Sequence, residues 1–343
     1  MTFLRYSFLV FLLPVFISCS SMKYSGPETD HFDGEKFHNL IQLEDKISLW
    51  EFIKLRPWRF NKESEDKWLW KEITPTNPSD HDFLGARVIF INHASFLIQI
   101  NGINILTDPI WSNKCGPFGR LGPSRFHKPG ILFEDLPKVD IVLVSHNHYD
   151  HMDLTTLKRL KEKHNPLFIV GLGNTRYLKF IDKNKIVELD WWQKRNLYDL
   201  NIYMVPAQHW SIRTRFDVNE SLWGGFFIES KNSSIFFAGD TAEGPHFNMV
   251  RKRIGEPQIA LLPIGAYLPR DFMKSSHMGP KEAVEAFKLL KAKKAVAMHF
   301  GTFPLGKDGP KMAAEELKRV LNKEKLQESF IIPEPGSIIQ VRK

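Results

Sequence analysis

The sequence has very little cysteine, with only Cys19 and Cys115 among its 343 residues. If Cys19 belongs to a processing signal, as argued below, one thiol remains and no internal disulfide can form. The chain also lacks any run of about 20 apolar residues, the length that a helix needs to cross a bilayer. We find no internal repeat and no low-complexity tract. These absences exclude a disulfide scaffold, a multi-span membrane protein and a repeat protein, and they favour one large globular domain.

Acidic residues are fewer than basic ones, 39 against 47, and the net charge of the chain is +8. A basic surface favours anionic partners such as phospholipid head groups or nucleic acid. Because no recognised nucleic-acid-binding motif occurs, we expect no nucleic-acid partner. The segment 54–60 alternates cations with aromatic residues, which suits a membrane interface. A packed connector with solvated charges is nevertheless the better explanation of that segment.

The most informative segment is His146-Asn147-His148-Tyr149-Asp150-His151. It follows the unbroken apolar run 141–144, which predicts a buried strand. Four side chains that can bind metal therefore gather within six residues at the end of a core strand. Neutral imidazole and carboxylate suit zinc and related divalent metals. The segment thus predicts a metal-binding loop rather than a polar turn that is rich in histidine by chance.

Three further residues of ligand type each follow an apolar, strand-like run: His209, Asp240 and His299. Taken alone, each is better explained as a structural histidine or a turn aspartate. Together with the six-residue segment they make seven ligands, enough for two metals that each keep an open position. Two metals about 3.5–4 Å apart generate a hydroxide at neutral pH, so the set predicts a hydrolytic centre.

The pattern His-x-His-x-Asp-His with a later His, Asp and His resembles the metallo-β-lactamase superfamily. Longer motifs are similar to those of the branch of N-acyl-phosphatidylethanolamine-hydrolysing phospholipase D. They stand in the order of that family and cover roughly residue 87 to the C-terminus. The motifs are Ile105–Ile110, Ser145–His151, Val205–Ser211, Leu222–Gly225, Phe237–Thr241, Pro263–Tyr267 with Pro269-Arg270, and His299–Leu305.

The resemblance implies how the ligands divide between two metal ions, which are expected to be Zn²⁺, although other divalent transition metals also suit these side chains. Asp150 is expected to be essential for catalysis. The first metal would be bound by His146, His148 and His209, the second by Asp150, His151 and His299, and Asp240 would bridge them.

The resemblance also implies roles around the metals. His277 matches a histidine on the phosphate side of the substrate, where it could bind the phosphate or protonate the leaving group. Tyr267 and Arg270 are candidates for lining the substrate entrance. Asp108 and His93 are candidates for orienting the ligands by hydrogen bonds, and His93 could equally be a buried turn histidine.

The N-terminus resembles a bacterial lipoprotein signal. Arg5 provides a short basic region, residues 8–17 form an apolar stretch too short to span a bilayer, and Ser18 precedes Cys19. We therefore expect cleavage before Cys19, acylation of its thiol, and an exported protein anchored to a bacterial membrane, inner or outer. Several acyl chains anchor firmly, whereas one alone binds marginally. The alternative is an ordinary secretory signal with an incidental cysteine.

Runs of strands with helical patterns between them predict an α/β fold, and the resemblance implies the αββα sandwich of the metallo-β-lactamase type. Cys115, in a loop rich in glycine and proline, is expected to be a bystander. We expect a signal peptide at 1–18, a tether and N-terminal extension at 19–82, and a hydrolase domain at 83–343. The expected strands include 87–91, 96–100 and 104–106, and the expected helices are 153–164, 280–290 and 311–322.

The expected reaction is metal-assisted hydrolysis of a phosphodiester. By resemblance, the substrate is N-acyl-phosphatidylethanolamine or a related phospholipid, and the products are N-acylethanolamine and phosphatidic acid. One alternative keeps the metals but opens a lactone or another small soluble ester. A second alternative is a lipoprotein whose metal site only binds, and the complete ligand set argues against it.

Overall fold

The computed structural model describes residues 23–41, 68–78 and 85–341. The expected signal peptide, the acylation site Cys19 and the segment 54–60 lie outside these residues. In the described part of the chain, no helix is both long enough and apolar enough to span a membrane.

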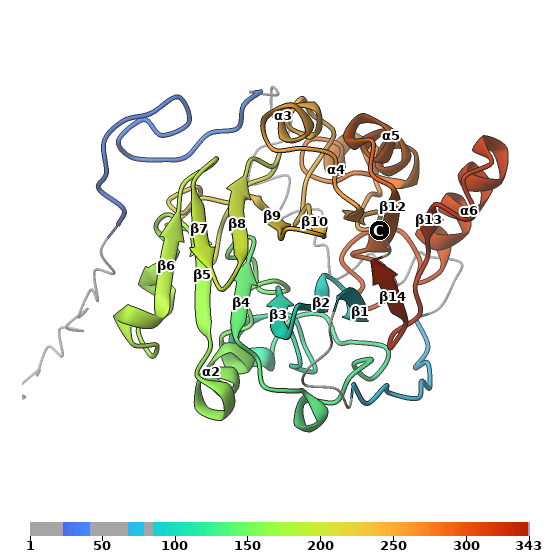
Figure 1. Cartoon of the computed structure of the whole chain (residues 1–343), viewed down its shortest axis with the longest axis horizontal. Coiled ribbons are helices and arrows are strands. Elements are labelled where there is room, and N and C mark those ends of the chain that lie inside the picture. The colour runs from blue at the N-terminus through green and yellow to red at the C-terminus, as the bar shows by residue number, and fades with distance from the viewer. Residues whose placement is uncertain (1–22, 42–67, 79–84, 342–343) are drawn as a thin grey trace, which may run out of the picture.

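Two seven-stranded sheets form the centre of the molecule (Figure 1). In the first sheet, β3 to β6 are parallel and the other pairings are antiparallel. Its order is β14 (Ile338–Val341), β1 (Ala86–Asn92), β2 (Ser95–Ile100), β3 (Ile103–Thr107), β4 (Ile141–Val144), β5 (Leu167–Gly171) and β6 (Ile186–Leu189).

In the second sheet, β10, β11, β12 and β13 run parallel to one another. The pairings β7–β8, β8–β9 and β9–β10 are antiparallel. Its order is β13 (Phe330–Ile331), β12 (Lys294–Met298), β11 (Ile259–Pro263), β10 (Ser234–Phe237), β9 (Gly225–Glu229), β8 (Leu200–Val205) and β7 (Lys194–Leu197).

Strands β1, β2 and β4 of the first sheet are buried on both faces, and β4 is apolar at every position. Ile141 and Leu143 of β4 join the large core between the sheets, whereas Val142 and Val144 join a separate core beneath α2. This alternation follows from the two-residue repeat of a strand. It explains why 141–144 reads as an unbroken apolar run rather than as an amphipathic strand.

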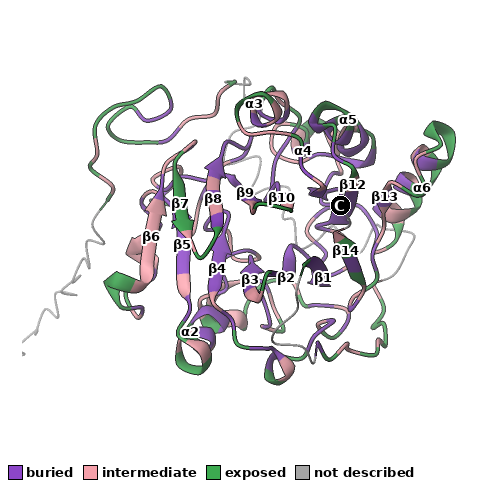
Figure 2. Ribbon diagram, in the orientation of Figure 1, coloured by how far each residue is buried: buried purple, intermediate pink, exposed green. Residues whose placement is uncertain are grey.

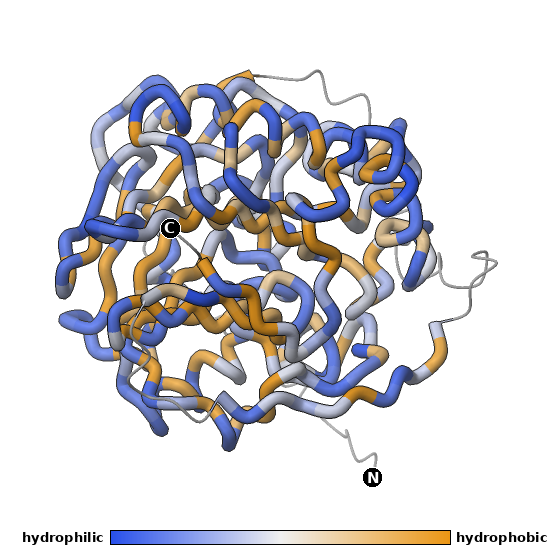
Figure 3. The backbone as a smooth tube through the Cα atoms, turned by 45° about the vertical axis from the view of Figure 1, so that its right-hand side comes forward, coloured by the Kyte–Doolittle hydropathy of each residue, from blue (hydrophilic) through white to orange (hydrophobic). Residues whose placement is uncertain are grey.

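Helices cover the outer faces of the two sheets. α2 packs on the first sheet, and Figure 1 places it on the opposite side of the molecule from α3, α4 and α5. Figure 2 shows buried residues concentrated in the strands, and Figure 3 shows that many of the chain segments in the interior are hydrophobic. The layers confirm the expected αββα sandwich. The helices are α2 (Leu154–His164), α3 (His246–Arg253), α4 (Arg270–Met273), α5 (Pro280–Leu290) and α6 (Met312–Glu324).

The expected strands and helices are confirmed to within one or two residues at each end. The start of α2 has a clear local cause, because the Asp153 carboxylate accepts a hydrogen bond from the backbone N–H of Thr155 and caps the helix. The edge strand β14 was not expected. It pairs antiparallel with β1, with Ala86 opposite Val341.

The N-terminal segment, residues 23–41, packs against the large core between the two sheets. The rings of Phe32 and Phe37 are buried in the large core, and the Phe37 backbone N–H donates to the Asn219 carbonyl over 2.8 Å. The His31 ring stacks on Trp191, with centroids 4.4 Å apart. These contacts fix the segment beside the loops that follow β6 and β8.

Candidate metal centre

The candidate ligands meet because each follows the carboxyl end of a strand. His146 to His151 follow β4, His209 follows β8, Asp240 follows β10 and His299 follows β12. Parallel strands end at the same edge of a sheet, so their following residues converge. Asp108 follows β3, the neighbour of β4, and His93 lies in the turn between β1 and β2.

Three histidines form the first group of candidate ligands. Nδ1 of His148 lies 2.9 Å from Nε2 of His146 and 3.2 Å from Nε2 of His209. His146 and His209 are buried and His148 is half-buried. Desolvation lowers the pKa of each ring: to about 3 for His148, to about 4 for His209 and well below the usual value for His146. The rings are therefore neutral at pH 7, which is the form that binds a metal.

The second group combines histidines with a carboxylate. Asp150 Oδ2 lies 3.3 Å from His151 Nε2 and 3.5 Å from His299 Nε2. The same oxygen lies 2.9 Å from Nε2 of His93, so the structure brings His93 directly to this group. His93 can therefore hold the Asp150 carboxylate in place or contribute a ligand itself.

The Asp240 carboxylate lies between the two groups. Its Oδ2 is 3.0 Å from His299 Nε2, 3.2 Å from His151 Nε2 and 3.8 Å from His209 Nε2. No other carboxylate of the described residues contacts histidines of both groups in this way. The bridging position assigned to Asp240 by the resemblance is geometrically available.

Three of the ligand histidines have a fixed partner on the ring nitrogen that faces away from the centre. His151 Nδ1 donates to Asp108 over 2.6 Å, His146 Nδ1 to Ser145 Oγ over 2.8 Å, and His209 Nδ1 to the Ser276 carbonyl over 2.8 Å. A bond at Nδ1 leaves the lone pair on Nε2, which points inward. Such partners set both the tautomer and the orientation of metal-binding histidines.

The cluster fits a divalent metal on two observations. First, Nε2 of His151 and Nε2 of His299 lie 3.0–3.5 Å from the carboxylate oxygens of Asp150 and Asp240 without a hydrogen bond to them, and Oδ1 of Asp240 is also buried without a hydrogen-bond partner in the described chain. Native structures rarely tolerate such unpaired buried atoms. Second, two ligands bound tetrahedrally to zinc at about 2.0–2.1 Å lie about 3.4 Å apart. The His209–His148 spacing of 3.2 Å and the His299–Asp150 spacing of 3.5 Å agree with that geometry.

The electrostatics of the second group also favour a bound cation. Burial alone would lower the pKa of His299, but the carboxylates of Asp240 and Asp150 outweigh it and raise that pKa to about 9. Burial likewise opposes protonation of His151, and the same two carboxylates with Asp108 raise its pKa well above the usual value. The centre attracts positive charge strongly, and a metal ion would supply it.

The backbone is held in unusual conformations around the site. His93, Asp108 and His299 have φ values of 46°, 34° and 60°, in the left-handed region that residues other than glycine rarely adopt. Such strain persists only where surrounding contacts impose it, and it clusters at functional sites. The His299 backbone N–H donates to the His93 carbonyl over 2.8 Å, which ties two of these residues together.

His277 reaches the centre from the connection between α4 and α5. Its Nδ1 lies 3.8 Å from Asp240 Oδ2, and its ring centroid lies 5.1 Å from that of His209. Nδ1 is buried and has no hydrogen-bond partner in the described chain. His277 is therefore positioned to contact whatever binds beside the metals.

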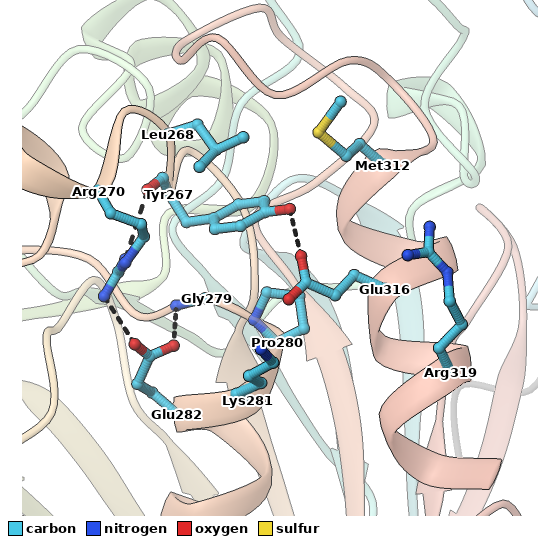
Figure 4. A pocket seen from close by; sticks show the side chains of 10 residues that line it. All are labelled: Tyr267, Leu268, Arg270, Gly279, Pro280, Lys281, Glu282, Met312, Glu316 and Arg319. Atoms are coloured by element: carbon cyan, nitrogen blue, oxygen red, sulfur yellow. Dashed lines mark hydrogen bonds and ion pairs between the residues drawn. The ribbon is translucent and has the colours of Figure 1, made fainter. Parts of the chain in front are cut away.

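Tyr267 and Arg270 line a pocket of about 500 Å³ between the start of α5 and α6 (Figure 4). The Tyr267 hydroxyl donates to Glu316 over 2.6 Å. Arg270 pairs with Glu282 at 2.8 Å and donates to the His277 carbonyl over 3.1 Å. Arg270 thus holds the connection that carries His277, and its charge is paired with Glu282. Tyr267 instead ties its own loop to α6.

Sequence reasoning missed residues that act on the ligands through the backbone. Asn39 binds the backbone of His209, and Thr302 Oγ1 accepts from the His93 backbone N–H over 2.9 Å. Neither residue carries a side chain that suggests metal chemistry. Asn39 precedes the matched motifs altogether, so no local signal marks it.

Comparison with known proteins agrees with this geometry. The sequence model of a beta-lactamase superfamily domain matches residues 103–300. N-acyl-phosphatidylethanolamine-hydrolyzing phospholipase D 1 of Caenorhabditis elegans is 35% identical over 237 residues, 66% of this chain and 67% of that protein. A UPF0173 metal-dependent hydrolase of Methanopyrus kandleri is 31% identical over 259 residues, 73% of this chain and 97% of that protein.

A solved structure supports the fold independently. A metallo hydrolase from Ignicoccus hospitalis superposes with a TM-score of 0.56 at 22% identity, over 75% of this chain and 99% of that one. Two facing sheets with a buried His/Asp cluster at their strand ends, together with the similarity in sequence to metal-dependent hydrolases, define a metal-dependent hydrolase. The chain belongs to the beta-lactamase superfamily and is related to phospholipases D that hydrolyse N-acyl-phosphatidylethanolamine and to UPF0173 hydrolases.

Proposed function

We propose that this protein is a dinuclear zinc phosphodiesterase of the phospholipase D type. Its substrate would be N-acyl-phosphatidylethanolamine or a related phospholipid, and its products N-acylethanolamine and phosphatidic acid. The observation that supports this most strongly is the position of His277, whose Nδ1 lies 3.8 Å from the carboxylate between the two ligand groups. The similarity to a phospholipase D that hydrolyses N-acyl-phosphatidylethanolamine extends over 237 residues and supports the same assignment.

Each residue then has a defined task. His146, His148 and His209 would hold one metal, Asp150, His151 and His299 the other, and Asp240 would bridge them. Two bound metals supply a nucleophilic hydroxide at neutral pH and stabilise negative charge on the phosphoryl oxygens. His277, with its unpaired buried nitrogen, would hydrogen-bond the phosphate or protonate the leaving oxygen.

We further propose that the mature chain is anchored to a bacterial membrane through acylated Cys19. The basic surface and the lipoprotein-like segment ending at Cys19 support this. An anchored enzyme meets membrane lipids at a high effective concentration, so even weak intrinsic affinity suffices.

The test is product analysis by mass spectrometry after purified protein is incubated with mixed bacterial phospholipids and N-acyl-phosphatidylethanolamine. Phosphatidic acid together with N-acylethanolamine is the expected outcome, and Asp150→Asn protein serves as the matched inactive control. A parallel incubation with a water-soluble lactone tests the competing activity. If the protein opens the lactone and releases no phosphatidic acid, the phospholipase proposal is wrong and the protein is a lactonase.

A further inference from the structure

The side-chain amide of Asn39 clamps the backbone of one candidate metal ligand. Its Nδ2 donates to the His209 carbonyl over 2.8 Å, and its Oδ1 accepts from the His209 backbone N–H over 3.0 Å. A single primary amide thus satisfies both polar backbone groups of one residue. Only asparagine and glutamine offer a donor and an acceptor in this fixed arrangement.

His209 depends on this clamp because it lies outside regular structure. It stands four residues beyond the end of β8, where no sheet ladder holds the backbone. Within the described residues, Asn39 is the only hydrogen-bond partner of the His209 backbone N–H and carbonyl. The His209 ring is fixed separately, through Nδ1 to the Ser276 carbonyl.

The clamp itself rests on a rigid support. Asn39 Oδ1 also accepts from Trp223 Nε1 over 3.2 Å, and the Trp223 ring is buried in the large core. Two residues farther along, the Ile41 carbonyl accepts from the side chain of Gln208, the neighbour of His209, over 2.9 Å. Upstream, buried Phe37 anchors the same segment.

We propose that Asn39 is a positioning residue for the metal held by His146, His148 and His209, supplied by a segment that precedes the matched family domain. This rests on the metal-binding part of the proposed function. Because the amide binds both the N–H and the carbonyl of the His209 backbone, it fixes the position of His209 Nε2 relative to Nδ1 of His148, which lies 3.2 Å away. Groups that orient metal ligands in this way change metal affinity by about 10–100-fold when removed.

The experiment compares metal affinity in the full chain for the parent, Asn39→Ala, Asn39→Asp and His38→Ala. Zinc is titrated against a competing chromogenic chelator, and the cobalt-substituted proteins are compared by their absorption spectra. His38 is the matched control, because it neighbours Asn39 but its ring pairs with Asp33 at an exposed site and, among the described residues, with no candidate ligand. Thermal melting without metal checks that each variant folds.

We expect Asn39→Ala to bind one of its two metals about 10–100-fold more weakly, with an altered cobalt spectrum. Asn39→Asp keeps the acceptor but sets a carboxylate oxygen against the His209 carbonyl in place of the donor, so it should weaken the same metal at least as much, and it decides the matter if Asn39→Ala does not fold. His38→Ala should match the parent.

Unchanged affinity and spectrum in the folded Asn39 variant overturn the proposal, as does equal weakening of both metals or an equal loss in His38→Ala. A parent protein that binds no metal overturns the proposed function itself. If the parent protein binds metal and the Asn39→Ala variant binds it equally well, only the role of Asn39 is overturned.

Discussion

The Asp108 carboxylate lies 2.6 Å from Nδ1 of His151, and both side chains are completely buried. The same carboxylate accepts from the hydroxyl and the backbone N–H of Ser145, and that hydroxyl accepts from Nδ1 of His146. One carboxylate therefore orients a ligand of each candidate metal.

We predict that Asp108→Asn weakens metal binding at both positions by about 10-fold or more, because an amide cannot accept from His151 and Ser145 as the carboxylate does. Ser145→Ala should affect mainly the metal that binds His146. Elemental analysis after dialysis against graded chelator measures both variants. If Asp108→Asn retains both metals as the parent does, Asp108 has no such role.

Asp150→Asn should keep the fold and lose most activity, because the amide cannot replace a carboxylate ligand of the second metal. We expect natively purified parent protein to contain about two metal ions per chain and this variant to contain fewer. Asp199→Asn, at an exposed turn between β7 and β8, is the control. Parent protein free of transition metal would contradict the two-metal proposal.

Cys19→Ala should block processing of the precursor or release the protein from its membrane anchor. The reason is that acylation requires the thiol, and several acyl chains together bind a membrane firmly. Cell fractionation with immunoblotting gives the distribution, and mass spectrometry gives the mature N-terminus. A variant processed and distributed as the parent is would favour the ordinary secretory signal.

His277→Ala should reduce hydrolysis of N-acyl phospholipid by roughly 10²–10⁴-fold, the usual contribution of one positioned acid–base group. Metal content should stay unchanged, which separates this variant from the ligand variants. Lys274→Ala, an exposed change just after α4, is the control. Equal phospholipid turnover by the His277→Ala and parent proteins would favour the lactonase alternative.

The buried ring of His246 should make the protein less stable in acid. Burial lowers its pKa to about 3, so between pH 6.5 and that value only the unfolded chain takes up the proton. Stability from this group is therefore present above pH 6.5 and is lost as the pH falls. From pH 7 to pH 5 we expect it to reduce the free energy of unfolding by about 2 kcal/mol.

Denaturant unfolding of parent and His246→Gln protein at both pH values measures this contribution. The variant lacks the titrating ring, so its free energy of unfolding should fall less between pH 7 and pH 5. Other buried histidines act equally in both proteins and cancel in the comparison. Identical pH dependence in the two proteins would show that His246 titrates normally in the folded state.

The elements and the convergence of ligands were predictable because local patterns encode them. The run 141–144 marks a strand, and ligands at the ends of parallel strands must meet at one edge. Asp153 marks the beginning of α2, and Pro280 in the first turn marks that of α5. These signals depend only on neighbours in the sequence.

The supports of the ligands were not predictable, because they join residues far apart with no periodic pattern. Asn39 and His209 are separated by 170 positions, and His93 and Thr302 by 209. In the sequence, a polar residue that binds a distant backbone group cannot be distinguished from one that faces water. Only the packing of the N-terminal segment and of the loop after β12 reveals which of them hold the site.

The pairing of β1 with β14 constrains the order in which the chain can fold. Ala86 lies opposite Val341, and Gly336 donates to the Phe90 carbonyl over 2.7 Å. During synthesis, β1 is made long before its partner on that side. Until β14 arrives, β1 presents an open edge with buried apolar neighbours, the kind of surface that recruits other chains. The sheet that carries His146 to His151 is therefore complete only after β14 has been made.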